Sequence, residues 1–319
     1  MSWKVLITHR LLPEATAYLK KRVNVEFCPE KGVLSKRDII SRIGDKDGLL
    51  CLLTDEIGRD IIEAAPRLRI IANCAVGTDN IDLASSRQKG ILVTNTPGVL
   101  TETTAELTWA LILAVARKIP QADIFTRQKS FKGWKLDLFL GKDIQGKRLG
   151  IIGLGRIGKA VAHRAAAFGL EIFYYDRRRL SLEEEKKYRA AFLPLDDLLR
   201  TADIISIHAS LTEESHHLIS AKKLRLMKKD AFLINVARGP IVDEKALADA
   251  LEEGRLWGAG LDVYEREPVI EKKLLRLKNV VLLPHLGSAT FETRLKMAMA
   301  AAKNLVQGLR GERPDNLVN

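Results

Sequence analysis

The sequence predicts an α/β protein made of two doubly wound, mainly parallel sheets. Short apolar runs alternate with longer helix-like segments along the chain, which is the pattern of strands joined by crossover helices. A glycine-rich run, Gly153–Gly158, follows one apolar run and opens a helix-like segment. The chain has 319 residues, more than one domain usually holds, so we expect two domains with separate cores.

The N-terminal part is expected to form a first sheet that has no glycine fingerprint. Its predicted strands are residues 3–8, 48–54, 69–75 and 91–94. A long apolar-rich segment, residues 101–119, is predicted to be a helix that begins at Thr101. The glycine-rich run therefore comes after a complete first unit.

The run Gly153-Leu154-Gly155-Arg156-Ile157-Gly158 has the form and the context of a dinucleotide-binding turn. It follows the predicted strand 149–152, and Asp176 comes at the end of the next predicted strand, 171–175. The first glycine permits a tight turn, the second lets a pyrophosphate approach the backbone, and the third lets helix and strand pack closely. The helix N-terminus favours the anion, and Asp176 is expected to bind ribose hydroxyls.

The rest of the chain predicts an inserted domain. Further strands are expected at residues 204–207, 231–236, 258–263 and 280–283. The tail from Thr290 to Leu309 has a helical pattern, with too few residues after it for a third domain, so we expect it to return to the first sheet. The predicted substrate domain comprises residues 1–99 and 290–319, and residues 100–289 form the inserted dinucleotide-binding domain.

Composition argues against several classes of protein. Fifty-two Lys and Arg against 40 Asp and Glu give a net charge of +12, but the charges are scattered, without the dense basic tract of a nucleic-acid-binding module. No apolar stretch of 18 residues and no signal-peptide pattern occur, which predicts a cytosolic protein without a membrane partner. Cys28, Cys51 and Cys74 form no CxxC pair and fit reduced packing thiols better than a disulfide or metal framework.

Polar residues come at or just after the ends of four predicted strands. These are His208, Arg238, Asp262 and His285, and Glu267 lies in the loop between the last two strands. Ligands of open α/β sheets bind outside the carboxyl ends of strands, so we expect these side chains to share an edge with the glycine-rich turn. Each alone also fits a structural role, Arg238 as a surface cation and His285 as a core histidine. Their convergence on one edge makes them a candidate site.

Four stretches together resemble the motif set of the D-isomer-specific 2-hydroxyacid dehydrogenases: Gly153–Gly158, Asn235–Gly239, Gly260–Pro268 and Pro284–Thr290. Three others are similar to the glyoxylate and hydroxypyruvate reductase branch of that family: Ala75–Asp82, Thr94–Pro97 and Val99–Glu106. The resemblance covers nearly the whole chain. It implies two Rossmann-like or flavodoxin-like domains, with the nucleotide domain inserted into the substrate domain.

The resemblance implies that Arg238, Glu267 and His285 are catalytic, and their chemistry agrees. Reduction of a 2-oxo acid needs a cation for the carboxylate and carbonyl oxygens, which the guanidinium of Arg238 provides. It also needs a proton donor for the developing alkoxide, a role that suits the imidazole of His285 because histidine is a common general acid and base in enzymes. Glu267 is expected to orient the imidazole and favour its protonated form. A nicotinamide cofactor supplies the hydride.

Substrate binding is implied for two backbone groups and two side chains. The N–H groups of Val76 and Gly77 are expected to bind the substrate carboxylate, in a loop before a helix predicted to start near Asp79. Arg238 is the cation of this site, and Leu53 resembles a wall of the pocket. An ordinary turn at Val76 and Gly77 is the alternative.

Cofactor binding is implied for the glycine-rich turn and for residues that follow other strands. The set is Thr104, Gly153, Gly155, Arg156, Ile157, Gly158, Asp176, Arg177, His208, Ala237, Asp262 and His285. For His208, a packed histidine at a strand end is an equal alternative. Asp176 should repel a 2′-phosphate and favour NAD, whereas the adjacent Arg177–Arg179 leave NADP open.

We therefore expect an NAD(P)H-dependent reductase of a small 2-oxo acid, glyoxylate or hydroxypyruvate, that forms the D-2-hydroxy acid. Val76 stands where phosphite-oxidising relatives carry a lysine, and Glu267 where formate-oxidising relatives carry a glutamine, which argues against both substrates. A D-3-phosphoglycerate or D-lactate dehydrogenase stays open, because side-chain specificity depends on loops. A nucleotide-sensing binding protein similar to the C-terminal-binding corepressors is a remote alternative.

The family resemblance also suggests a homodimer with residues 100–145 at the interface. Trp134 lies in this segment and fits either a dimer contact or core packing.

Overall fold

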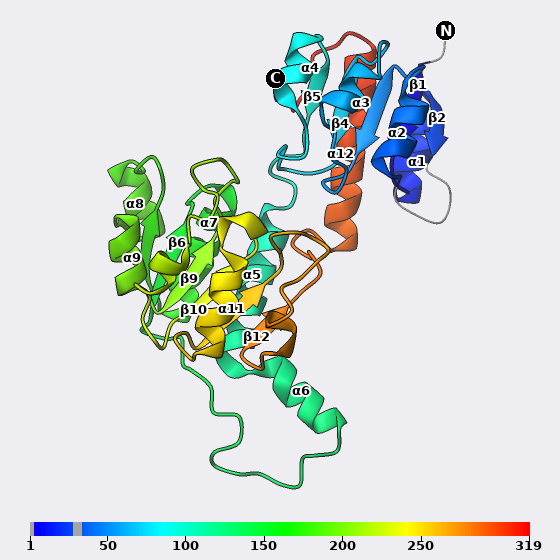
Figure 1. Ribbon diagram of the computed structural model, residues 1–319. Helices are drawn as coiled ribbons and strands as arrows, with labels where there is room; N and C mark the ends of the chain where they lie inside the picture. The colour runs from blue at the N-terminus through cyan, green and yellow to red at the C-terminus, as the bar shows by residue number, and fades with distance from the viewer. Residues whose placement is uncertain (1–2, 28–33) are drawn as a thin grey trace. The chain divides into compact units, whose positions relative to one another are not determined.

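The computed structural model describes residues 3–27 and 34–319, so that Cys28 lies outside the described residues. The chain divides into two compact units, each built on one parallel sheet (Figure 1). The first unit comprises Met1–Leu100 and Ser288–Asn319, and the second comprises Thr101–Gly287. The predicted α/β class with two parallel sheets is confirmed.

The first sheet has five parallel strands in the order β2-β1-β3-β4-β5. Its strands are β1 (Lys4–Ile7), β2 (Asn24–Phe27), β3 (Gly48–Cys51), β4 (Ile70–Asn73) and β5 (Leu92–Thr94). The helices between them are α1 (Pro13–Lys20), α2 (Lys36–Ile43), α3 (Arg59–Glu63) and α4 (Leu83–Gln88). The sequence did not predict β2, because this edge strand is partly exposed and lacks the continuous apolar run of the central strands.

The C-terminal helix α12 (Phe291–Leu309) packs in the first unit. The hydroxyl of Thr290 caps it by accepting the N–H of Thr293 at 3.2 Å. The helix approaches the sheet closely, since a Cβ on Gly308 would lie 2.4 Å from Cδ1 of Ile70. The chain therefore returns to the first sheet after the second unit is complete.

The second sheet has seven parallel strands in the order β12-β11-β10-β9-β6-β7-β8. Its strands are β6 (Arg148–Ile152), β7 (Glu171–Tyr175), β8 (Ala190–Phe192), β9 (Ile204–Ile207), β10 (Phe232–Asn235), β11 (Gly258–Leu261) and β12 (Val280–Leu282). The sequence predicted all of these except β8, an edge strand of only three residues.

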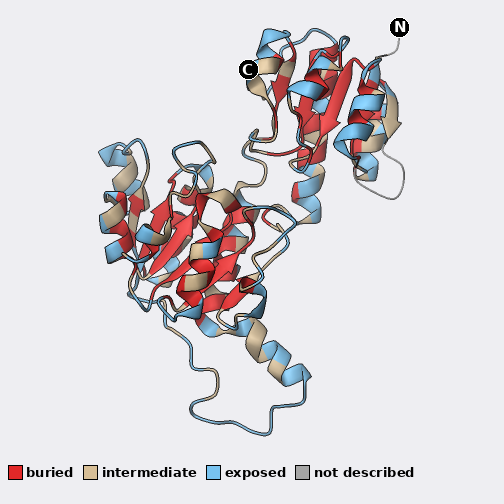
Figure 2. Cartoon of the chain, viewed as in Figure 1, coloured by how far each residue is buried: buried red, intermediate tan, exposed pale blue. Residues whose placement is uncertain are grey.

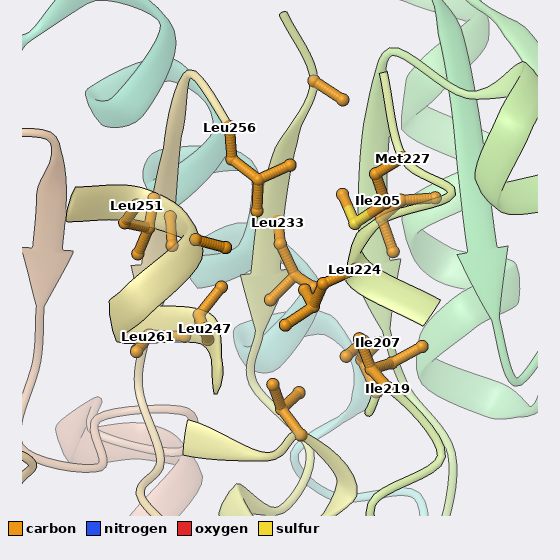
Figure 3. Close-up of a cluster of buried hydrophobic side chains, with 14 of the residues drawn as sticks. Ile205, Ile207, Ile219, Leu224, Met227, Leu233, Leu247, Leu251, Leu256 and Leu261 are labelled. Atoms are coloured by element: carbon orange, nitrogen blue, oxygen red, sulfur yellow. The ribbon is translucent and has the colours of Figure 1, made fainter. Parts of the chain in front are cut away.

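Helices cover this second sheet, and the strands between them are buried (Figure 2). The helices of this unit are α5 (Thr101–Arg117), α6 (Ile119–Arg127), α7 (Arg156–Ala165), α8 (Leu182–Tyr188), α9 (Leu195–Thr201), α10 (Ala221–Leu224) and α11 (Glu244–Glu252), with the 3₁₀ helices η1 (Ala166–Phe168), η2 (Gly239–Ile241) and η3 (Leu274–Arg276); α6 does not cover the sheet. Figure 3 shows one buried cluster, in which Leu233 and Leu261 of the sheet lie with Leu247 and Leu251 of α11. Burying each leucine stabilises the fold by about 2 kcal/mol relative to exposing it.

Residues 119–145, which we call the arm, follow α5 and project from the second unit (Figure 1). The arm consists of α6 and of residues 128–145, which form neither helix nor strand. Its large exposed apolar side chains are Ile119, Ile124, Phe131, Trp134, Leu136 and Leu140. Trp134 is 79% exposed, so the core-packing alternative for this residue is wrong.

Within the described residues, no helix combines the length and the apolar character needed to cross a membrane.

Candidate active site

The parallel direction of the second sheet brings the predicted site residues to one edge. The strands β12, β11, β10, β9 and β6 are consecutive neighbours. His285, Asp262, Arg238 and His208 follow the first four of these strands, and the glycine-rich turn follows β6. The prediction that they share an edge is confirmed.

His285 and Glu267 form a hydrogen-bonded pair at this edge. Nδ1 of His285 lies 2.9 Å from Oε2 of Glu267, and both side chains are partly buried. Oε1 of Glu267 accepts the N–H of Tyr264 at 3.1 Å, which fixes the second carboxylate oxygen. Because Nδ1 of His285 faces Glu267, Nε2 is the ring nitrogen that remains to exchange a proton with a substrate.

The charge of Glu267 is set by opposing effects. Burial raises the pKa of its carboxyl group, but the hydrogen bond and charge of His285, the N–H of Tyr264 and the charge of Arg238 outweigh burial and hold the pKa below its usual value. Glu267 is therefore a carboxylate at neutral pH. A carboxylate in this position favours the protonated form of the neighbouring imidazole.

Asp262 holds the backbone that carries His285. Its buried carboxylate accepts the N–H of Leu286 at 2.6 Å and the N–H of Gly287 at 2.8 Å, and its carbonyl accepts the N–H of His285 at 3.0 Å. His285 has a φ of 56°, a left-handed conformation that costs a non-glycine residue about 1–3 kcal/mol. The three bonds to Asp262 stabilise this conformation. A cofactor contact of Asp262 would use the lone pairs of its carboxylate oxygens that are not engaged in these bonds.

Arg238 is mounted on a short segment after β10 whose backbone is fixed by Asn235. The amide of Asn235 donates to the carbonyl of Arg238 at 2.9 Å and accepts the N–H of Ala237 at 3.0 Å. Nη1 of Arg238 donates to the carbonyl of Ala237 at 2.8 Å. Gly239 follows in close contact with the next loop, since a Cβ there would lie 1.9 Å from the carbonyl carbon of Tyr264. The guanidinium is thus held in the region of Glu267, whose pKa its charge helps to lower.

The glycine-rich turn has the packing that a dinucleotide site requires. Gly153 has a φ of 90°, and a Cβ on it would lie 2.6 Å from the backbone nitrogen of Ala209. A Cβ on Gly158 would lie 2.3 Å from the carbonyl oxygen of Gly153, whereas a Cβ on Gly155 would meet no atom within 4 Å. The first and third glycines are required by close packing, and the second leaves open space at the N-terminus of α7, where Arg156 and Ile157 begin the helix.

Asp176, and not the arginine run, is directed at the glycine-rich turn. Oδ2 of Asp176 accepts the N–H of Leu154 at 2.9 Å. Arg179 binds Glu185 through Nε and Nη2 at 2.8 and 3.0 Å, which ties it to α8. Arg177 is exposed beside Asp176. Arg179 is therefore paired with Glu185 and not with the glycine-rich turn.

His208 and Thr104 are packed inside the second unit. Nε2 of His208 lies 2.8 Å from Oγ of Ser206, and burial lowers the pKa of the imidazole to about 3, so the ring is neutral. Among the described residues, its buried Nδ1 has no hydrogen-bond partner, a group that a bound molecule would satisfy. The buried Thr104 hydroxyl donates to the carbonyl of Gly287 at 2.9 Å.

In the first unit, the loop after β4 that contains Val76 and Gly77 is held by two asparagine side chains. Asn95 donates to the carbonyl of Val76 at 2.8 Å, and Asn73 donates to the carbonyl of Gly77 at 2.9 Å. These bonds fix the carbonyl groups. Within the described residues, neither the Val76 nor the Gly77 N–H has an acceptor, so both are free to bind an anion.

The helix predicted to start near Asp79 starts later. α4 begins at Leu83, after the N-cap residue Asp82. The side-chain oxygen of Asn80 accepts the amide of Asn73 at 3.0 Å instead of a helix N–H, and its NH₂ group donates to the carbonyl of Leu52 at 3.0 Å. The geometry of the Val76–Gly77 loop therefore comes from side-chain amides and not from a helix N-terminus.

Leu53 is partly exposed in the loop after β3, beside a buried carboxylate that the sequence did not single out. Asp55 accepts the hydroxyl of Thr8 at 2.5 Å and the N–H of Leu52 at 2.8 Å, and lies 3.0 Å from Nε2 of His9. These bonds join the loops after β1 and β3. An acid in a loop gives no sequence signal for such a role, because its partners are distant along the chain.

The cysteines pack as predicted where the structure describes them. Cys51 and Cys74 are free thiols in the core of the first unit. Burial raises the pKa of both, that of Cys74 to about 12, so neither is a thiolate at neutral pH. Among residues 3–27 and 34–319, no cluster of His, Cys, Asp and Glu side chains is arranged to hold a metal ion.

The chain is similar to known proteins over its full length. Residues 109–287 match the family model of the D-isomer specific 2-hydroxyacid dehydrogenase, NAD binding domain. The chain is 48% identical over 320 residues to a glyoxylate reductase of Thermococcus kodakarensis, an alignment that covers 99% of this chain and 96% of that protein.

Two solved structures are similar over both units. A protein of Thermus thermophilus has 42% identity and a TM-score of 0.93, with 99% of this chain and 100% of that chain covered. An NADPH-dependent glyoxylate/hydroxypyruvate reductase from Sinorhizobium meliloti, in complex with NADP and malonate, has 30% identity and a TM-score of 0.87, with 100% and 97% covered. The family match over more than half of the chain and the full-length identity establish that this chain belongs to the D-isomer-specific 2-hydroxyacid dehydrogenases, which are NAD(P)-dependent oxidoreductases.

Proposed function

We propose that this protein reduces glyoxylate or hydroxypyruvate to glycolate or D-glycerate with a nicotinamide cofactor. The observation that carries the proposal is the Glu267–His285 pair, held at the same sheet edge as Arg238. A polarised proton donor and a cation are the groups that reduction of a 2-oxo acid requires. The glyoxylate reductase relatives support the choice of substrate.

In the proposed reaction, Arg238 binds the carboxylate and carbonyl oxygens of the substrate and polarises the carbonyl carbon. His285 donates the proton on Nε2 to the carbonyl oxygen as negative charge develops there. Glu267 holds Nδ1 at 2.9 Å and stabilises the imidazolium before the transfer. In the oxidation direction, the neutral imidazole accepts the proton of the substrate hydroxyl.

The residues around the glycine-rich turn fit a dinucleotide. The close packing at Gly153 and Gly158, the open space over Gly155 and the unsatisfied Nδ1 of His208 are the observations that support this fit. When bound, the nicotinamide cofactor supplies the hydride. Residues proposed to hold its pyrophosphate and ribose are Arg156, Ile157, Asp176 and Arg177, and those proposed for its nicotinamide end are Thr104, His208, Ala237, Asp262 and His285.

Asp176 supports a preference for NAD over NADP. Its carboxylate is anchored at the glycine-rich turn by the N–H of Leu154, where it would accept ribose hydroxyls and repel a 2′-phosphate. The exposed Arg177 is the opposing influence.

In the first unit, the unsatisfied N–H groups of Val76 and Gly77 are proposed to bind the substrate carboxylate, and Leu53 to contact the rest of the substrate. The bonds from Asn73 and Asn95 support this role, because they pre-orient the loop before substrate arrives.

We also propose a homodimer formed through the arm. Phe131, Trp134, Leu136 and Leu140 are 54–80% exposed, and such a patch on one element is typical of a protein–protein interface. The family resemblance suggests that a second copy of this chain covers the patch.

The buried free thiols Cys51 and Cys74 support a reducing compartment such as the cytosol.

A substrate panel tests the proposed function. Oxidation of NADH and NADPH is measured with glyoxylate, hydroxypyruvate, pyruvate and phosphohydroxypyruvate, on the wild type and on His285→Asn. We expect the highest kcat/KM for glyoxylate or hydroxypyruvate with NADH. In the variant, we expect kcat/KM to fall by about 10²–10⁴-fold, with a much smaller change in the Kd for NADH. Wild-type turnover by the variant would remove His285 as the proton donor.

A further inference from the structure

The turn that carries Glu267 lies outside the helices and strands of the second unit, yet it is closely tied down. It runs from Tyr264 to Glu271, between β11 and η3. The N–H of Val269 donates to the carbonyl of Arg266 at 2.8 Å, which places Glu267 at the tip of a tight turn. A functional carboxylate on a loop needs support from a rigid element, because errors of about 0.5 Å in its position lower the rate.

Glu244 supplies this support with both of its carboxylate oxygens. Oε2 accepts the N–H of Glu265 at 2.6 Å, and Oε1 accepts the N–H of Glu271 at 2.6 Å. The two bonds lie on either side of Glu267 in the sequence, so one side chain ties together both ends of the turn. Glu244 is only 8% exposed, and hydrogen bonds from N–H groups to a buried carboxylate are about twice as strong as neutral ones.

The position of Glu244 is itself fixed by the core. It is the first residue of α11, and the N-cap residue Asp243 accepts the N–H of Ala246 at 2.9 Å. Leu247 and Leu251 of the same helix lie in the buried cluster of Figure 3. The carboxylate therefore acts from a helix that is anchored to the sheet.

The side chain of Glu265, which lies in the turn, also binds the backbone of Glu244. Oε2 of Glu265 accepts the backbone N–H of Glu244 at 3.3 Å, and Oε1 of Glu265 lies 3.1 Å from Nε2 of His217. At the start of the turn, the carbonyl carbon of Tyr264 would lie 1.9 Å from a Cβ on Gly239. The turn is thus packed between α11 and the segment that carries Arg238.

From this geometry we propose that Glu244 is a positioning residue of the reaction. By tying the N–H groups of Glu265 and Glu271 to α11, it sets the position from which Glu267 binds Nδ1 of His285. This inference rests on the proposed function of the pair. Glu244 acts only through Glu267, because both of its own oxygens are bound by the backbone of the turn.

The test uses two substitutions of Glu244 and one control on the same helix. Glu244→Gln places an NH₂ group against one of the two N–H donors, and Glu244→Asp keeps the charge but is one methylene too short to bind both. Glu253→Gln is the control, since Glu253 is exposed at the end of α11 and its carboxylate binds Arg255 at 2.6 Å, away from the turn. We expect kcat with glyoxylate to fall about 10²-fold in Glu244→Gln and about tenfold in Glu244→Asp, with the Kd for NADH within about twofold of the control.

A double-variant comparison separates positioning from a general structural role. If Glu244 acts through Glu267 and His285, Glu244→Gln will lower kcat much less in a His285→Asn background than in the wild type, because the pair is already disabled. A wild-type kcat in both Glu244 variants, or the same fold loss in both backgrounds, overturns the proposal. His285→Asn alone tests the proposed function, so the two inferences fail separately.

Discussion

Nδ1 of His285 lies 2.9 Å from Oε2 of Glu267, although 18 positions separate the two residues in the sequence. Glu267 comes from the turn after β11, and His285 comes from the segment after β12, the neighbouring parallel strand. The pair exists because adjacent parallel strands end at the same edge of a sheet. The carboxylate at Nδ1 determines which nitrogen of His285 faces the substrate.

Glu267→Gln is expected to move the pH profile of reduction. A neutral amide stabilises positive charge on the imidazole less than a carboxylate does, so kcat/KM is expected to fall by about 10²-fold, and the acid limb that comes from titration of Glu267 is lost with the carboxyl group. On the acid side, the lowered pKa of Glu267 means that the pair is complete above the usual glutamate range and is lost only as pH falls through the lowered value. A full pH–rate profile measures this. The same kcat/KM and the same acid limb in the variant and the wild type would show that Glu267 does not act with His285.

Arg238→Lys is expected to lower kcat/KM for glyoxylate by about 10²-fold or more, because a lysine keeps the charge but loses the two-pronged geometry for carboxylate and carbonyl oxygens. Steady-state kinetics check this, with Arg255→Lys as the control on an exposed arginine bound to Glu253. Kinetics equal to those of the control would exclude Arg238 from the site.

Asp176→Ala is expected to raise kcat/KM with NADPH relative to NADH by about tenfold. The substitution removes a negative charge from the glycine-rich turn and leaves Arg177 to attract a 2′-phosphate. Arg179→Ala serves as the control, because Arg179 is bound to Glu185 and its loss should leave the cofactor preference unchanged. If Asp176→Ala left the ratio at the wild-type value, its carboxylate would not contact the ribose.

Asn95→Ala is expected to raise the KM for glyoxylate by about tenfold, with a smaller effect on the Kd for NADH. Without the bond to the carbonyl of Val76, the loop must be ordered when substrate binds. Asn279→Ala is a matched control, since it removes an asparagine bond of 3.3 Å to the carbonyl of Leu251 in the second unit. Equal KM values for the two variants would argue against carboxylate binding by Val76 and Gly77.

Substitution of Trp134 and Leu136 together by Ser is expected to convert a dimer into a monomer. Trp134 is 79% exposed and Leu136 is 80% exposed on the arm, so their removal takes apolar area from an interface without opening a cavity in the core. Light scattering measures the molecular mass of the variant. Leu182→Ser is the control, because it removes a leucine that is 67% exposed on α8, outside the arm. A wild-type protein that is monomeric at micromolar concentration would contradict the proposed dimer outright.

The sequence by itself determined the architecture and the residues at the sheet edge. Alternating apolar runs predicted the two parallel sheets, and Gly153–Gly158 marked the turn after β6, because only glycine fits positions where a Cβ would strike the backbone. His285 and Arg238 were found because each follows a recognisable strand. These features depend on residues that are close together in the chain, so the sequence pattern and the spacing of motifs predict them.

Only the tertiary structure decided how these groups are held. Glu244 binds N–H groups 21 and 27 positions away, Asn95 binds a loop 19 positions earlier, and Asp262 uses both of its carboxylate oxygens on backbone N–H groups. Nothing in local propensity distinguishes such a side chain from a solvated one. Its role depends on which loops the fold brings within hydrogen-bond distance, and this is a property of the packed chain.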